Sequence, residues 1–171
     1  ARLELIGGDV LVTSYAGSVE RIQIDNGGRV WGQQSNAAYD CAAAINADET
    51  LVAVGDAGGM VQLLEASRGT VIATRDLQFP VQLLAFVDDR LVVITQGRQR
   101  MELSLPELDE LAHSAIKARA VAFSRDGQLL LENGTVVDAK SQSNGPAPVT
   151  RVALRGGELC YGAGGGQWII A

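Results

Sequence analysis

A short pattern recurs every 30 to 40 residues, and this repeat limits the folds open to the chain more than any other feature. Each unit has a turn rich in Asp or Gly, then a leucine, then a short apolar run. The aligned leucines are Leu11, Leu51, Leu91, Leu129 and Leu159. A period of this length indicates stacked supersecondary modules, because one such module cannot bury its apolar faces alone.

Each unit is predicted to consist of β-strands. Its apolar runs are about 4 to 7 residues long, rich in Val, Ile and Leu, and separated by Gly, Asp and Asn. In the first three units a fourth, outer strand is predicted within residues 28–33, 69–77 and 109–115. Leu105–Ile116 also carries apolar residues at helical spacing, and its place in the repeat favours a β-hairpin.

Four short antiparallel strands per unit predict an all-β fold, a β-propeller of about five four-stranded blades. The chain is then a single propeller domain or a propeller fragment. The repeat units are predicted at residues 1–36, 37–77, 78–116, 117–146 and 147–171.

The last two blades are predicted to be incomplete. The fourth unit loses its outer strand or has it replaced by the polar segment Lys140–Val149, whose two prolines restrict it to a sheet edge or a loop. The fifth unit stops after its third strand. Two alternatives follow: an open ring completed by more sequence or by another chain, or a compact five-bladed ring with one poor blade.

Two stretches resemble known repeat families. "VAFSRDGQLLL" (121–131) resembles the hairpin between the first two strands of bacterial WD40-type repeats. Residues 8–33 resemble a quinoprotein (PQQ-like) repeat, with Asp25, Gly28 and Trp31 at the places of its Asp, Gly and Trp. The Gly-His and Trp-Asp pairs of WD40 repeats are missing. The resemblance implies a divergent propeller that serves as a platform for protein contacts, and it transfers no functional residue.

Charge and hydropathy exclude some classes of function. The net charge of −6 at pH 7 argues against binding of nucleic acid or an anionic membrane by the whole surface. No apolar run approaches the roughly 18 residues of a membrane helix. Cys41 and Cys160 lie in apolar surroundings and are interpreted as core residues. The compartment is not indicated.

The sequence offers few residues for catalysis or metal binding. His113 is the only histidine, so a histidine metal site has no second ligand of that kind. Ser114 beside it would point to the opposite face of a strand. The carboxylate pairs Asp48-Glu49 and Asp88-Asp89 are expected to cap hairpin turns. No catalytic residue, metal or cofactor is therefore predicted.

Four basic residues are the candidate binding site. The turn between the second and third strands of a blade should share one rim with the connection to the next blade. Arg98 and Arg100 would then lie near Lys117 and Arg119, as a basic patch for an acidic partner. The alternative is that neighbouring glutamates neutralise the patch, or that it is merely solvated.

The leading functional hypothesis is a non-catalytic protein-interaction or scaffold module that presents rim loops to a protein partner or to the rest of a larger chain. One alternative is a ligand-binding protein or enzyme with its site in the axial funnel. Another is a structural domain that closes a larger assembly, or pairs with a second copy, through its unfinished edge.

Overall fold

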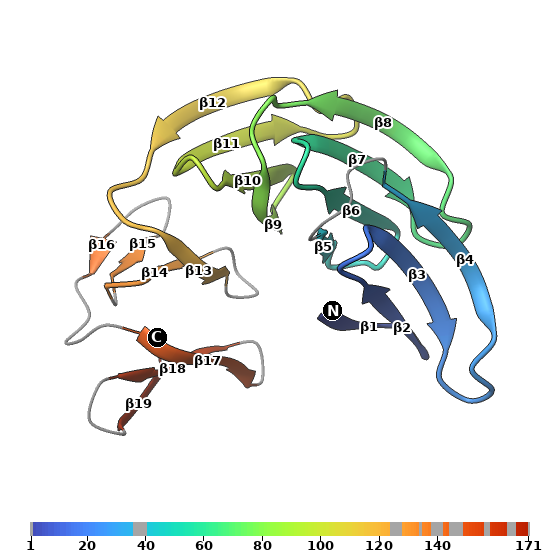
Figure 1. Ribbon diagram of the computed structural model, residues 1–171, viewed down its shortest axis with the longest axis horizontal. Coiled ribbons are helices and arrows are strands. Elements are labelled where there is room, and N and C mark those ends of the chain that lie inside the picture. The colour runs from blue at the N-terminus through green and yellow to red at the C-terminus, as the bar shows by residue number, and fades with distance from the viewer. Residues whose placement is uncertain are drawn as a thin grey trace. The chain divides into compact units, whose positions relative to one another are not determined.

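Every regular element in the described part of the chain is a β-strand (Figure 1). The computed structural model describes residues 2–35, 41–123, 128–133, 135–137, 142–143, 149–155, 158–163 and 167–170. The chain divides into two compact units, Ala1–Ser114 and Ala115–Ala171. We call each sheet a blade. In every blade, each strand pairs antiparallel with its neighbours in sequence.

The first unit holds three four-stranded blades, with the boundary falling at the last residue of the third. Their outer strands lie where the sequence predicted them. The first blade is β1 (Arg2–Ile6), β2 (Asp9–Thr13), β3 (Ser18–Gln23) and β4 (Arg29–Gln34). The second is β5 (Ala42–Ile45), β6 (Leu51–Gly55), β7 (Met60–Glu65) and β8 (Val71–Asp76). The third is β9 (Val81–Val87), β10 (Arg90–Thr95), β11 (Gln99–Ser104) and β12 (Glu110–Ala115), so Leu105–Ile116 contains a strand and no helix.

The second unit holds a four-stranded and a three-stranded blade. The fourth blade is β13 (Ala120–Phe123), β14 (Leu129–Leu131), β15 (Val136–Val137) and β16 (Gln142–Ser143). The fifth is β17 (Val149–Arg155), β18 (Glu158–Ala163) and β19 (Gln167–Ile170). The polar segment of the fourth unit thus supplies a two-residue edge strand, β16, paired with β15. The predicted turn at residues 124–127 lies outside the described residues.

The repeated leucines all fall in the second strand of a blade, but they do not all share one face. Counted back from Ser14, the first residue of the following turn, Leu11 is third. Counted back from Thr95, Leu91 is fourth. A shift of one residue turns a side chain to the opposite face of a sheet. Leu11 accordingly packs toward the next blade, whereas Leu91 packs toward the preceding one.

Two apolar clusters fill the spaces between the three blades of the first unit. The middle blade contributes to both, because alternate residues of a strand point to opposite faces. Val52 and Val54 face the first blade, while Ala53, Val61 and Leu63 face the third. The cluster between the first and second blades is Ile6, Leu11, Val19, Trp31, Cys41, Ala43, Val52, Val54, Leu64 and Ala66.

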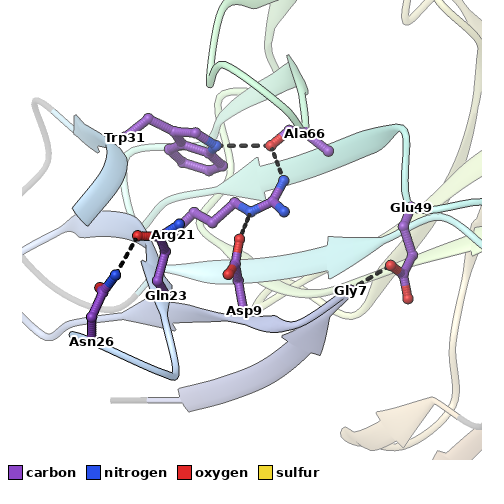
Figure 2. Close-up of polar contacts among 8 residues, drawn as sticks. All are labelled: Gly7, Asp9, Arg21, Gln23, Asn26, Trp31, Glu49 and Ala66. Atoms are coloured by element: carbon purple, nitrogen blue, oxygen red, sulfur yellow. Dashed lines mark hydrogen bonds and ion pairs between the residues drawn. The ribbon is translucent and has the colours of Figure 1, made fainter. Parts of the chain in front are cut away.

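In the carboxylate pair Asp48-Glu49, Asp48 Oδ1 accepts the Thr50 hydroxyl at 3.0 Å within its own hairpin turn, but the predicted capping of the turn's backbone is done by another residue. That role belongs to Asn46, whose Oδ1 accepts the Leu51 amide at 2.8 Å. Glu49 instead reaches the first blade, where its Oε2 accepts the Gly7 amide at 2.6 Å (Figure 2). The Glu49 side chain therefore joins the second blade to the first.

Trp31 and Arg21 bind one carbonyl of the second blade (Figure 2). Trp31 Nε1 donates to Ala66 O at 2.8 Å, and Arg21 Nη1 donates to the same oxygen at 2.9 Å. Arg21 Nε also donates to Asp9 Oδ2 at 2.6 Å. A carbonyl oxygen has two lone pairs and can accept both donors. The buried indole is thus held by packing and by a hydrogen bond across the blade interface.

The two blade interfaces distribute side-chain volume in opposite ways. Gly69 and Leu108 occupy the same position of their turns, with φ of 69° and 63°. A Cβ added to Gly69 would lie 2.6 Å from Trp31 Cδ2, so only glycine fits beneath the ring. In the next interface Ala73 takes the place of Trp31, and the fully buried Leu108 fills the space. In the first interface the large Trp31 side chain packs on a glycine that has no side chain. In the second interface the small Ala73 side chain lies opposite the large Leu108.

This size relation predicts a double-mutant effect. Trp31→Ala should lower the free energy of unfolding by about 3–5 kcal/mol because it leaves a cavity. Gly69→Leu should also destabilise, since it collides with the ring and leaves leucine at positive φ. The double variant should recover part of the loss, as measured by urea unfolding.

Gly27→Leu is the matched control for the backbone strain. Gly27 has a φ of 70° in the equivalent turn, and nothing lies within 4 Å of an added Cβ. Gly69→Leu should therefore cost more than Gly27→Leu. Strictly additive losses in the double variant would contradict the proposed complementarity.

Candidate functional site

The turns between second and third strands share one rim with the connections between blades. Ser35, after the first blade, donates its amide to Gly17 O of the β2–β3 turn at 2.8 Å. Leu77, after the second blade, does the same to Gly59 O of the β6–β7 turn at 2.9 Å. The arrangement predicted from blade topology therefore holds within the first unit. We call this end of the unit the rim.

Asp56 is the buried polar centre of the rim. Its Oδ1 accepts the amides of Gly58 (2.8 Å) and Met60 (3.0 Å), which closes the β6–β7 turn. Its Oδ2 accepts the hydroxyl of Ser35 from the preceding connection. Its backbone oxygen accepts the Val81 amide at 2.9 Å, where β9 begins. One residue thus joins its own turn to both neighbouring blades.

The connection Leu77–Pro80 is held at both ends by backbone hydrogen bonds. Leu77 and Val81 donate to the β6–β7 turn, as described above. Pro80 O accepts the Gln96 amide at 2.8 Å, which fixes the connection to the β10–β11 turn of the third blade. Short loops fixed in this way on rigid sheets are suited to presenting side chains to a partner.

Phe79 is the side chain that this connection presents. Its exposed fraction is 49%. The backbone of Phe79 lies against Gly59, since a Cβ added to Gly59 would be 2.8 Å from Phe79 N. The Phe79 ring lies near Gly97, since a Cβ added there would be 3.9 Å from Phe79 Cδ1. The exposed Arg98 follows Gly97 at the tip of the β10–β11 turn. The Phe79 ring therefore lies near Gly97, one residue before Arg98, and aromatic residues and arginine are both enriched in protein interfaces.

The predicted basic residues differ in their surroundings. Arg98 is exposed, has a φ of 60°, and forms no ion pair with a described residue. Arg100 donates to Glu102 at 3.0 Å, so this one of the four basic residues is paired with a glutamate. Lys117 and Arg119 are exposed in the second unit, before β13. That the four form one patch stays a prediction.

Glu102 pairs with two arginines of the third blade. It also accepts Arg90 Nη1 at 2.9 Å and therefore lies between two guanidinium groups on one face of β10 and β11. The hydrogen bond that Arg90 donates to Glu102 raises the pKa of Arg90 most, followed by the negative charges of Glu102 and Asp89. Arg90 and Arg100 are thus less available to an outside anion than Arg98.

The described residues bring no group of metal-ligating side chains together. They contain no cluster of three His, Cys, Asp or Glu side chains that could hold a metal. His113 is exposed on β12, with Nε2 3.0 Å from Gln99 Oε1 and Nδ1 3.7 Å from Glu110 Oε1. Cys41 is buried in the first apolar cluster, as predicted. The same residues include no helix with the length and apolarity needed to cross a membrane.

Solved structures with the same architecture are readily found. The β-propeller domain of Cps50 (Swd1) from Myceliophteria thermophila aligns with a TM-score of 0.71 and 13% identity over 94% of this chain and 60% of that one. The WD40 β-propeller domain of Doa1 aligns at 0.72 and 16% over 98% and 62%. U3-55K aligns at 0.74 and 18% over 95% and 57%.

The fold is a β-propeller. At these identities the likeness shows the fold alone. The described residues form four four-stranded blades and a three-stranded fifth. The chain spans about three fifths of the length of each of these three propellers. No protein-family model and no curated protein matches the sequence.

The Asp56 contacts predict a local stability effect. Asp56→Ala removes the acceptor for three donors and should lower the free energy of unfolding by about 1–3 kcal/mol. Amide hydrogen exchange should quicken at Gly58 and Met60, whose amides lose their carboxylate acceptor. Ser14→Ala, in the equivalent turn of the first blade, is the matched control, because Ser14 Oγ bonds only within its own turn. Equal losses in the two variants would show that the contact with Ser35 contributes nothing.

Proposed function

We propose that the chain is a non-catalytic interaction module that presents its rim to a protein partner. The observation that carries this proposal is the fixed connection Leu77–Pro80, which exposes Phe79 near Gly97, the residue before Arg98. An aromatic side chain on a fixed loop loses little conformational entropy on binding. Contact with a protein surface would also remove its exposed apolar area from water. The proposal agrees with the platform role that the resemblance implies.

The partner surface is proposed to be acidic where it meets Arg98. The whole chain carries a net charge of −6, so general attraction would favour a basic protein. An exposed arginine without a carboxylate partner among the described residues is a local exception. Lys117 and Arg119 would extend this exception if the predicted basic patch forms.

We further propose that the five blades belong to a larger propeller. The chain covers 57–62% of the three propellers compared above, and the third strand of its fifth blade has no outer neighbour among the described residues. A scaffold module of this kind would offer a longer rim than the first unit alone.

Phe79 is expected to be a binding hot spot. A photo-cross-linking amino acid at position 79 should capture the partner in cells, and one at Ile72 on β8 should not. With the captured protein purified, Phe79→Asp should weaken binding by about 30-fold or more, the effect of losing a hot spot. Ile72→Asp, an equally exposed apolar site on an outer strand, is the control. Equal affinities of the two variants in calorimetry would contradict the proposal.

The basic patch makes a separate electrostatic prediction. Arg98→Glu should slow association with the same partner, and the slowing should weaken as salt rises. Lys117→Glu and Arg119→Glu should do the same if the patch is one surface. Arg68→Glu, in the β7–β8 turn at the other end of the strands, is the matched control. An effect confined to Arg98 in surface plasmon resonance would remove Lys117 and Arg119 from the site.

A further inference from the structure

The first blade has an apolar face whose equivalent positions are buried in the second and third blades. Leu3 pairs with Val12 across β1 and β2, in the same register as Ala43 with Val54. Ala43 is 8% exposed and packs against the first blade, whereas Leu3 is 69% exposed. Leu5, two residues along β1, is 73% exposed. We call this surface, formed by Leu3, Leu5, Val10, Val12, Ile22 and Ile24, the open face.

The third blade supports the same comparison. Leu84 pairs with Val93 at the positions of Leu3 and Val12, and Leu84 is 7% exposed because the second blade covers it. In both internal interfaces this face meets the opposite face of the preceding blade. The open face therefore has the side chains of a blade interface, and neither of the other two blades of the first unit covers it.

An empty position for an aromatic ring lies beside the open face. Gly27 and Gly69 close equivalent turns, by amide bonds to Gln23 O (2.9 Å) and Glu65 O (2.8 Å). The Trp31 ring covers Gly69, but no atom lies within 4 Å of an added Cβ on Gly27. Since the two turns share their backbone conformation, Gly27 offers the surface on which a tryptophan packs in the next interface.

We propose that the open face binds a further four-stranded blade of the same polypeptide, and that a tryptophan on the outer strand of that blade covers Gly27. This inference rests on the proposed membership of a larger propeller, and it adds the surface and the chemistry of the contact. A second copy fits less well, because Trp31 is buried in the first interface and a copied open face would bring no ring to Gly27.

The experiment adds a covering blade to the whole chain. Residues 1–40 are duplicated ahead of residue 1, so that the added blade joins the original one through its own connection. A cysteine probe, Leu5→Cys in the original blade, reports cover of the open face by its rate of thiol labelling. The chain without the probe gives the background from Cys41 and Cys160.

The probe should label rapidly in the 171-residue chain and at least tenfold more slowly in the extended chain. Exchanging side-chain sizes tests the ring contact directly. An added blade with Trp31→Ala should lose most of the protection on a Gly27 recipient. It should regain protection on a Gly27→Leu recipient, as Ala73 and Leu108 pair in the second interface. The unaltered added blade should fail to protect the Gly27→Leu recipient.

Three results would overturn the inference. Slow labelling in the 171-residue chain at every concentration would show that the chain covers the face itself. Slow labelling only at high concentration would assign the face to a second copy. Rapid labelling in the extended chain, with circular dichroism showing folded sheets, would show that a blade does not bind there. Partner binding at Phe79 is measured independently, so failure of the rim proposal would leave these results unchanged.

Discussion

A four-stranded blade has two apolar faces, and water must be kept from both. This constraint explains the organisation of the first unit. Within the first unit, the middle blade packs against a described blade on each of its faces, and its second strand is buried on alternate sides by different neighbours. Stability in such repeats comes from interfaces between units as much as from the units themselves. The polar contacts of Asp9, Arg21 and Glu49 act at these same interfaces.

The interfaces share a backbone plan but not a set of side chains. Different residues fill the same place in the two interfaces. Trp31 packs on Gly69 in the first, and Leu108 fills the space beside Ala73 in the second. Packing of this kind constrains summed volume more than identity. A propeller can therefore keep its strand order while its sequence diverges, which agrees with TM-scores above 0.7 at identities of 13–18%.

The sequence predicted the blades because strand periodicity and turn residues are local signals. It placed the outer strands of the first three units, and it placed all five leucines in second strands. The face of Leu91 escaped it, since the β9–β10 turn moves that leucine by one position relative to Leu11. Phe79 also escaped it, because a single aromatic in a connection belongs to no repeat. The pairing of Arg100 with Glu102 had a visible signal, as residues two apart in a strand share a face.

The connection Leu77–Pro80 is bonded to two blades at once. A protein bound to Phe79 would therefore contact a loop that is hydrogen-bonded to both blades. Separation of those blades would also disrupt the bound complex. Binding at the rim and the stability of the blade interface are then coupled. A bound partner would raise the free energy needed to separate the two blades, by an amount set by the partner's affinity and concentration.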